Sequence, residues 1–148
     1  MRVNGAPIQI RAAAGADASA VADMAGELAQ SFAFSRARFE VSYRSLLDTA
    51  SACLLVATDG RDHLGYLLGF RHLTFFANGP VGWVEEILVS HGQRGLGTGR
   101  ALMDSFEQWA AGHSCAMIAL ATRRAAPFYL ALGYEESAVY LRKILPQK

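Results

Sequence analysis

The sequence is poor in cysteine and in charge, and each shortage excludes a class of protein. Its 148 residues include two cysteines, Cys53 and Cys115, too few and too far apart for a disulfide framework or a cysteine-based zinc site. Both lie in apolar segments and are expected to be reduced core residues. Charged residues make up 18% of the chain and the formal net charge is +1, so nucleic acid is not an expected partner.

Long hydrophobic runs are absent as well. No stretch approaches the ~20 apolar residues that cross a bilayer, and the first residues lack the apolar centre of a signal peptide. No membrane partner is therefore expected, and the predicted location is the cytoplasm. What the chain does have is 52% hydrophobic residues, enough to bury a substantial core. Because no repeat or linker divides it, residues 1–148 are expected to form a single domain.

Hydrophobic periodicity predicts a mixture of strands and helices. Short apolar runs or strict alternation indicate strands, whereas apolar positions at helical spacing indicate helices. The predicted strands cover residues 8–11, 53–58, 64–76, 83–89, 116–120 and 138–145. The predicted helices begin at Asp17, near Phe39, after Gly99 and at Ala125. The order β-α-α-β-β-β-α-β-α-β predicts an α+β domain that mixes antiparallel and parallel pairing.

The most informative segment is the glycine-rich turn at residues 89–100, between a strand and an amphipathic helix. Glycines let a ligand approach the backbone, and N–H groups at a helix N-terminus attract phosphate oxygens. A P-loop would need Lys after Gly97, where Thr98 stands, and a dinucleotide fingerprint would need a small residue in place of Arg100. Both interpretations fail. A different phosphate-binding turn and a glycine turn without any ligand stay open.

Two motifs then resemble one family. Gln93-Arg94-Gly95-Leu96-Gly97-Thr98-Gly99 resembles the Q/R-x-x-G-x-G/A motif of the GNAT superfamily of N-acetyltransferases. Downstream, Ala125-Ala126-Pro127-Phe128-Tyr129-Leu130-Ala131-Leu132-Gly133-Tyr134 is similar to the GNAT segment A-x-x-F/L-Y-x-x-L-G-F. The order of elements matches that fold over nearly the whole chain. The resemblance implies a mixed central sheet flanked by helices, with an antiparallel N-terminal meander and a splayed parallel pair in the middle.

The resemblance also implies acetyl-CoA as cosubstrate and no metal. The glycine turn would clasp the pyrophosphate of coenzyme A through backbone N–H groups, helped by its arginines. The strand before it would offer backbone groups to the acetyl group and the pantetheine arm. Where many relatives carry Asn, seven residues before the motif tyrosine, this chain has Thr122. Phe128 is also expected to belong to the core. The expected cofactor contacts are Ile87, Leu88, Val89, Gln93, Arg94, Gly95, Leu96, Gly97, Thr98, Gly99, Arg100, Thr122 and Phe128.

Three side chains are candidates for the chemistry. Glu85 and Glu86 interrupt an apolar strand, where carboxylates are costly to bury without a partner. Strand alternation points them to opposite faces, so one of them should line a given pocket. The segment around Glu85 and Glu86 is similar to the L-E-D-I-x-V segment of diamine acetyltransferases. This similarity favours Glu85 as the base or the amine anchor, with Glu86 as the second choice. The alternative is that both carboxylates have a purely structural role. Tyr129 is expected to be the general acid, because a phenol with a pKa of ~10 can protonate a departing thiolate.

The predicted function is transfer of an acetyl group from acetyl-CoA to the primary amine of a small cationic acceptor. The aromatic stretch at residues 73–76, with Trp83, is an alternative wall for an apolar acceptor, and a peptide or protein amine is a further alternative. A non-catalytic acetyl-CoA sensor is the competing class, although a sensor has no need for acid–base groups. An exposed strand at residues 138–145 would also allow pairing with a second copy of the chain, and hence a homodimer.

Overall fold

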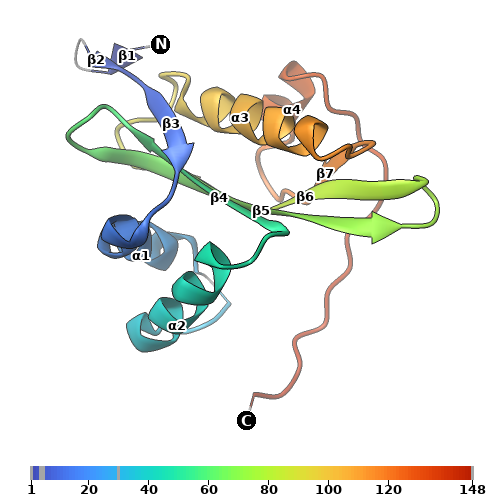
Figure 1. Cartoon of the computed structure of the whole chain (residues 1–148), viewed down its shortest axis with the longest axis horizontal. Helices are drawn as coiled ribbons and strands as arrows, with labels where there is room; N and C mark the ends of the chain where they lie inside the picture. The colour runs from blue at the N-terminus through green and yellow to red at the C-terminus, as the bar shows by residue number, and fades with distance from the viewer. Residues whose placement is uncertain (1, 4–5, 30, 148) are drawn as a thin grey trace.

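The computed structural model describes residues 2–3, 6–29 and 31–147, and a five-stranded mixed sheet lies at its centre (Figure 1). All neighbouring strands of this sheet are antiparallel except the last two, which are parallel. This is the predicted meander followed by a parallel pair. The strands, in spatial order, are β3 (Gln9–Ala12), β4 (Ala52–Thr58), β5 (His63–Thr74), β6 (Gly79–Val89) and β7 (Ile118–Leu120). A separate two-stranded ribbon, β1 (Arg2–Val3) with β2 (Ala6–Pro7), was not expected.

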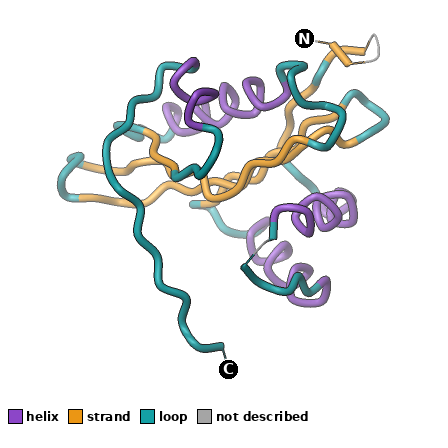
Figure 2. The backbone as a smooth tube through the Cα atoms, turned by 180° about the vertical axis from the view of Figure 1, so that it is seen from behind, coloured by secondary structure: helices purple, strands orange, loops and turns teal. Residues whose placement is uncertain are grey.

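Helices cover both faces of the sheet (Figures 1 and 2). On one face lie α1 (Ala18–Leu28), which follows a 3₁₀ turn at Gly15–Asp17, and α2 (Arg36–Leu47). On the other lie α3 (Thr98–Gly112) and the short α4 (Ala126–Ala131). Alternation along β5 sends Tyr66 into the apolar cluster under α1 and α2, and Leu67 into the cluster under α3 and α4. None of the described helices is long and apolar enough to cross a membrane.

The turn between β5 and β6 comes earlier than predicted. Residues 75–78 form it, so that β5 ends at Thr74 and β6 already begins at Gly79. Asn78 has a left-handed φ of 59°, a conformation that Asn tolerates better than most residues. Both cysteines are free: Cys53 is buried, and Cys115 is half-buried rather than in the core.

The predicted last strand at residues 138–145 is wrong. The described chain has neither helix nor strand from residue 134 to residue 147. This C-terminal tail crosses the β7 edge of the sheet from the α3–α4 side to the α1–α2 side (Figure 2). Its alternating side chains favour an extended backbone, but a strand also needs a neighbour to pair with. Within the described residues, β7 pairs with β6 alone.

An ion cluster around the buried Asp17 joins residues 11–17, at the start of α1, to His63 at the start of β5. The carboxylate of Asp17, which is 3% exposed, accepts hydrogen bonds from Arg11 Nη1 and Nη2 at 2.7 and 2.8 Å and from the Ala14 N–H at 2.8 Å. His63 Nε2 lies 2.7 Å from its other side. The Arg11 guanidinium, helped by His63 and the Ala14 N–H, holds the pKa of Asp17 well below its usual range although burial opposes this. Asp17, where the sequence predicts the first helix to begin, is the N-cap residue of α1, but its side chain makes no cap hydrogen bond to that helix.

Replacing Asp17 with Asn should lower the free energy of unfolding by about 2–4 kcal/mol, because Arg11 and His63 lose a buried partner. Since the folded-state pKa of Asp17 is depressed, its stabilisation is present above the unfolded pKa of ~3.9 and is lost as the pH falls below it. Urea unfolding of the wild type and of Asp17→Asn checks this. The difference between their free energies of unfolding should be smaller at about pH 3 than at neutral pH. Asp23→Asn, which breaks the exposed pair with Arg36, is the control and should cost under about 1 kcal/mol. Equal losses from the two variants would contradict the assignment.

Candidate active site

The site begins where β6 and β7 part. The two strands are joined by a parallel register of only three residue pairs, Gly82–Ile118, Trp83–Ala119 and Val84–Leu120. From residue 85 to residue 89, β6 keeps β5 on one side and has no strand on the other within the described chain. The open edge therefore presents backbone N–H and C=O groups that no strand satisfies. These are the positions, Ile87 to Val89, that the resemblance assigns to cofactor binding.

A β-bulge lies at the point of parting. Leu68 of β5 faces Glu86, but Gly69 faces Val84, so Glu85 is an extra residue in β6. Gly69 has a packing reason to be glycine, because a Cβ there would lie 2.3 Å from Cε1 of the fully buried Phe106 on α3. The ring occupies the space that a side chain would need. Helix α3 thus packs closely against the sheet opposite the bulge.

The two glutamates lie in different surroundings. Glu86 Oε1 accepts a hydrogen bond of 2.7 Å from the hydroxyl of Tyr66, which is 1% exposed. Burial, and then the charge of Glu86, raise the pKa of Tyr66 far above its ordinary value, so the phenol stays a donor. Glu85 is exposed, and its Oε2 accepts from Trp83 Nε1 at 2.7 Å. Glu86 is therefore the more enclosed and more firmly oriented carboxylate, although the sequence similarity ranks Glu85 first.

The glycine turn between β6 and α3 leaves a helix end without a cap. Gly95 and Gly97 have φ values of 80° and 89°, which favour glycine. Gly97 is the N-cap of α3 and has no side chain that could accept from the first turn. The N–H groups of residues 98–100 therefore have no acceptor within the helix, and its dipole adds a positive potential. Such an end is suited to bind a phosphate group.

Two buried oxygens in the same turn also lack partners. Among the described residues, Gln93 Oε1 and Thr98 Oγ1 are buried side-chain atoms without a hydrogen bond. Thr98 is 1% exposed, so the cost of leaving its hydroxyl unpaired is substantial. The side chains of Arg94 and Arg100 are exposed on the turn, as is Leu96. The turn thus combines unpaired polar groups with two nearby positive charges.

The second motif lies beside this turn. A Cβ on Gly99 would lie 3.2 Å from Phe128 Cζ, which places the ring of Phe128 against the start of α3. The expectation that Phe128 belongs to the core is wrong, because 37% of the residue is exposed. Thr122 Oγ1 accepts from the Ala125 N–H at 3.0 Å and so stabilises the turn that leads into α4. This contact gives Thr122 a structural role in place of the family's Asn.

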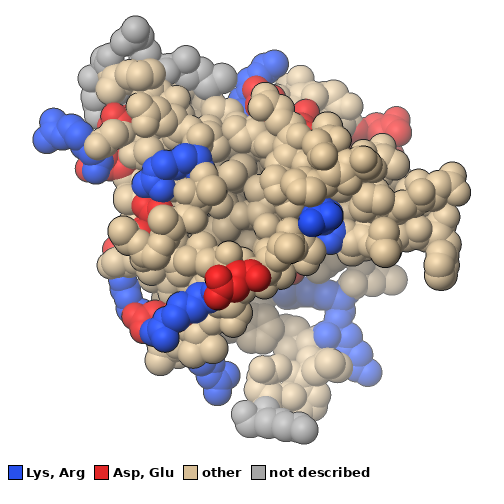
Figure 3. Space-filling view, in the orientation of Figure 1, with Lys and Arg blue, Asp and Glu red and all other residues tan. Residues whose placement is uncertain are grey.

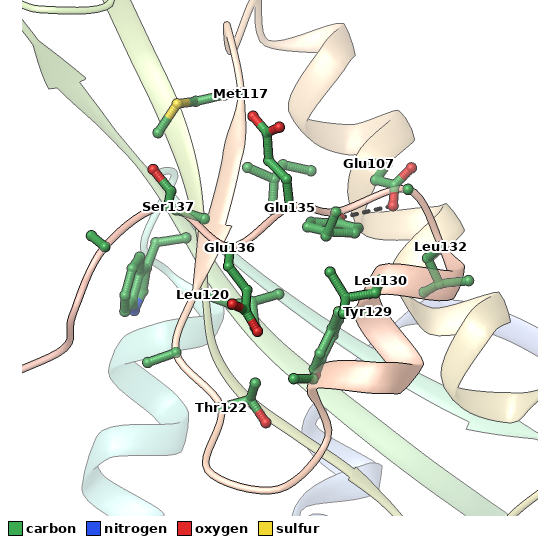
Figure 4. A pocket seen from close by; sticks show the side chains of 18 of the residues that line it. Glu107, Met117, Leu120, Thr122, Tyr129, Leu130, Leu132, Glu135, Glu136 and Ser137 are labelled. Carbon is green, nitrogen blue, oxygen red and sulfur yellow. Dashed lines mark hydrogen bonds between the residues drawn. The ribbon is translucent and has the colours of Figure 1, made fainter.

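Tyr129 projects from α4 into the apolar cluster that also holds Ile87. Its ring makes edge contacts with Phe128 and Tyr134, with centroids 4.9 and 5.9 Å apart, and burial raises its pKa. Tyr129 and Thr122 lie at one end of a groove of ≈ 980 Å³ between β7, α4 and residues 134–140 (Figure 4). We call this groove the β7 slot.

A second groove, of ≈ 820 Å³, lies on the opposite face, between α1, α2 and the sheet. Glu85 and Glu86 both line this α1–α2 groove, so the expectation that strand alternation puts only one of them in a given pocket is wrong, because the bulge at Glu85 interrupts the alternation. The structure does not bring them into one cavity with Tyr129. The open edge of β6 lies between the two grooves. The sequence patterns place Phe32 in a helix, but α1 ends before it at Leu28. Residues of this groove that the sequence patterns do not single out include Phe34, Arg38, Arg123 and Arg142.

Residues 73–76 line neither groove, whereas Trp83, the other part of the alternative acceptor wall, lines the β7 slot. Leu73, Phe75 and Phe76 are exposed at the far end of the β5–β6 hairpin. This end forms an uncharged projection on the face shown in Figure 3, where Lys and Arg otherwise lie scattered among Asp and Glu. Within the part of the chain that the structure describes, no three His, Cys, Asp or Glu side chains come together as metal ligands would.

Comparison with known proteins agrees with this geometry. The model of the acetyltransferase (GNAT) family matches residues 21–134. A transcriptional regulator from Bacillus halodurans C-125 is similar in structure, with a TM-score of 0.84 and 20% identity over 94% of this chain and 100% of that chain. Glucosamine-6-phosphate N-acetyltransferase from Arabidopsis thaliana has a TM-score of 0.82 and 16% identity over 95% of this chain and 99% of that chain. AAC(6')-Iy in complex with the bisubstrate analog CoA-S-monomethyl-acetylneamine has a TM-score of 0.78 and 18% identity over 94% of this chain and 99% of that chain. No curated protein matches the chain in sequence.

The left-handed turn can be tested by its cost to stability. Gly97→Ala should lower the free energy of unfolding by about 1–2 kcal/mol, because Ala disfavours a φ of 89°. Gly112→Ala is the control: it lies at the end of α3 with no atom within 4 Å of an added Cβ, and should be neutral or slightly stabilising. Thermal unfolding of the three proteins gives the comparison. No loss in Gly97→Ala would contradict the observed turn geometry.

Proposed function

Because the chain belongs to the GNAT family of acetyltransferases, we propose that it transfers the acetyl group of acetyl-CoA to a primary amine of a small acceptor. The observation that carries the proposal is the open edge of β6 beside the uncapped start of α3. The open edge of β6 can receive an acyl group and an extended arm along its backbone. The start of α3 can receive a pyrophosphate. No other part of the described chain combines these two features with an acid and a carboxylate.

The residues of the glycine turn fit coenzyme A. The N–H groups of residues 98–100 and the unpaired Thr98 Oγ1 would donate to pyrophosphate oxygens. Arg94 and Arg100 are exposed at the turn and would add charge-assisted hydrogen bonds. Phe128, whose ring lies against Gly99, would cover one side of the bound molecule. Backbone groups of residues 87–89 would hold the pantetheine arm and the acetyl carbonyl.

Acetyl-CoA supplies an acetyl group activated as a thioester. In the transfer, the acceptor nitrogen forms a bond to the acetyl carbon while the carbon–sulfur bond breaks. Glu86, held by Tyr66, takes the amine proton directly or through water, and N–H groups of residues 87–89 donate to the acetyl oxygen. Tyr129 gives its proton to the departing thiolate. Because burial raises its pKa, Tyr129 is protonated and ready to donate at neutral pH.

The acceptor is proposed to enter the α1–α2 groove, where Glu86 anchors its amine as a cation. Aromatic side chains from the α1–α2 connection and α2, such as Phe34 and Phe39, offer apolar contact. Arg38, Arg123 and Arg142 line the same groove, so an anionic group elsewhere on the acceptor would also find a partner. The structural relatives include enzymes named for glucosamine 6-phosphate and bound to an acetylneamine analog, which supports a small amine.

A non-catalytic acetyl-CoA sensor is the second candidate. The similarity in fold to a transcriptional regulator favours it, and that regulator is matched over its whole length. Against it, Tyr129 and Glu86 supply an acid and a base that binding alone does not require. Transfer to a protein or peptide amine would use the same chemistry. Activity measured on peptides and on small amines distinguishes the two kinds of acceptor.

Tyr129→Phe and Glu86→Gln should each lower kcat by about 10²-fold or more, because each removes one of the two proton transfers. The affinity for CoA, measured by calorimetric titration, should change less than about twofold, because neither side chain lies in the glycine turn. Turnover is measured as free thiol released from acetyl-CoA with polyamines, amino sugars, amino acids and peptides as acceptors.

Glu85→Gln is the matched control, since it changes the neighbouring, exposed carboxylate. It should keep most of the activity. If Glu85→Gln lost activity and Glu86→Gln kept it, the base would be Glu85, as the sequence similarity ranks it. CoA binding without turnover on any acceptor would support the sensor. Absence of CoA binding would contradict both candidates.

A further inference from the structure

Tyr66 carries a hydroxyl group in a place where the packing requires only a ring. The residue is 1% exposed and belongs to the apolar cluster under α1 and α2, together with Val21, Met24 and Leu88. A phenylalanine would fill the same space, and a buried hydroxyl is costly unless it has a partner. Among the described residues, its hydrogen-bond partner is Glu86, whose Oε1 lies 2.7 Å from the hydroxyl. The hydroxyl is therefore explained by Glu86 and not by the core.

This hydrogen bond runs from the closed interior to the wall of the α1–α2 groove. In the β5–β6 ladder Tyr66 lies opposite Leu88, and Leu68 lies opposite Glu86, so the phenol reaches Glu86 diagonally along one face of the strand pair. The surrounding cluster fixes the ring, whereas Glu86 is half-buried and lines the groove. No donor among the described residues reaches Glu86 Oε2. That second oxygen can therefore accept from an amine in the groove.

The other charged and titratable side chains of the groove act on Glu86 less directly. The residues that α1 and β4 contribute to the groove are apolar. Glu85 is a like charge and disfavours the ionised form of Glu86, whereas the arginines favour it, but in the described chain none of them forms an ion pair or a hydrogen bond with Glu86. Exposed charges are also weakened by solvent. These side chains are Arg38 and Tyr43 of α2, Glu85 of β6, Arg123 after β7 and Arg142 of the C-terminal tail.

We propose that Tyr66 is a positioning residue, whose hydroxyl orients the Glu86 carboxylate for the acceptor and favours the ionised form that can take a proton. Tyr66 can have this role only if Glu86 is the base, so the proposal rests on the proposed function. A phenol donates a stronger hydrogen bond to a carboxylate than to a neutral acid. Holding Oε1 also limits the rotation of the carboxylate and leaves Oε2 for the amine. Tyr66 is enclosed by the cluster, so it acts through Glu86 and not on the substrates.

Tyr66→Phe keeps the ring and removes the hydroxyl. It should lower kcat by about tenfold and move the acid limb of the pH profile of kcat/KM to higher pH by about half a unit or more, because the ionised carboxylate loses its donor. The affinity for CoA should not change. Tyr43→Phe is the matched control, because Tyr43 is 3% exposed in the same cluster and its hydroxyl donates to the Ala14 carbonyl. The control should lower the melting temperature to a similar extent and leave the pH profile in place.

A double variant separates positioning from a purely structural role. If Tyr66 acts through Glu86, Tyr66→Phe/Glu86→Gln should be no slower than Glu86→Gln alone, because no carboxylate is left for the phenol to hold. Rate losses that multiply in the double variant would overturn the proposal. A pH profile that does not move in Tyr66→Phe, or moves equally in Tyr43→Phe, would overturn it too.

A titration without turnover distinguishes failure of this proposal from failure of the proposed function. NMR of protein with isotope-labelled glutamate follows the Glu86 carboxylate, whose signal is identified by its loss in Glu86→Gln. Tyr66→Phe should raise the pH at which this signal is half-titrated by about half a unit or more, and Tyr43→Phe should not. This shift without turnover on any acceptor would support the hold of Tyr66 on Glu86 and contradict the proposed catalysis. Turnover without the shift would contradict the role of Tyr66 alone.

Discussion

The short pairing between β6 and β7 is the constraint that creates the candidate site. Three residue pairs join the strands, and beyond Val84 the edge of β6 is open. The bulge at Glu85 coincides with the point of parting, and Phe106 packs closely on Gly69, which lies beside the bulge in β5. A continuous β6–β7 ladder would satisfy every backbone group of this edge and leave nothing to bind an acyl group. The unsatisfied edge is costly, and a bound ligand offsets that cost.

The opening connects two grooves of different character on the two faces of the sheet. On the α3–α4 side, the second motif contributes the buried Tyr129 and places Phe128 against Gly99 at the start of α3. On the α1–α2 side, Glu86 is oriented by a buried phenol and faces a groove rich in aromatic and arginine side chains. Cosubstrate and acceptor can therefore approach the same stretch of β6 from opposite faces. In the proposed function, the two substrates bind on different faces of the sheet and meet at this edge.

Local features could be predicted from the sequence, and features that depend on a distant partner could not. The glycine turn and the helix after it follow from residues that are adjacent in the chain, as does the short helix with Tyr129. By contrast, nothing near Asp17 indicates that its carboxylate binds Arg11 and His63. Alternation at residues 138–145 predicts an extended backbone, but not whether a neighbouring strand exists. Strand alternation predicts that Glu85 and Glu86 point to opposite faces, but the bulge at Glu85 interrupts the alternation and both line the α1–α2 groove.

In the proposed function, the open edge of β6 and the start of α3 together bind coenzyme A. Amide hydrogen exchange followed by mass spectrometry, with and without CoA, tests this directly because it reports on each segment of the backbone. This binding should slow the exchange of residues 85–89 and 94–100 on addition of CoA and leave the turn at residues 75–78 unchanged. Unchanged exchange in both segments, or protection confined to another part of the chain, would contradict it.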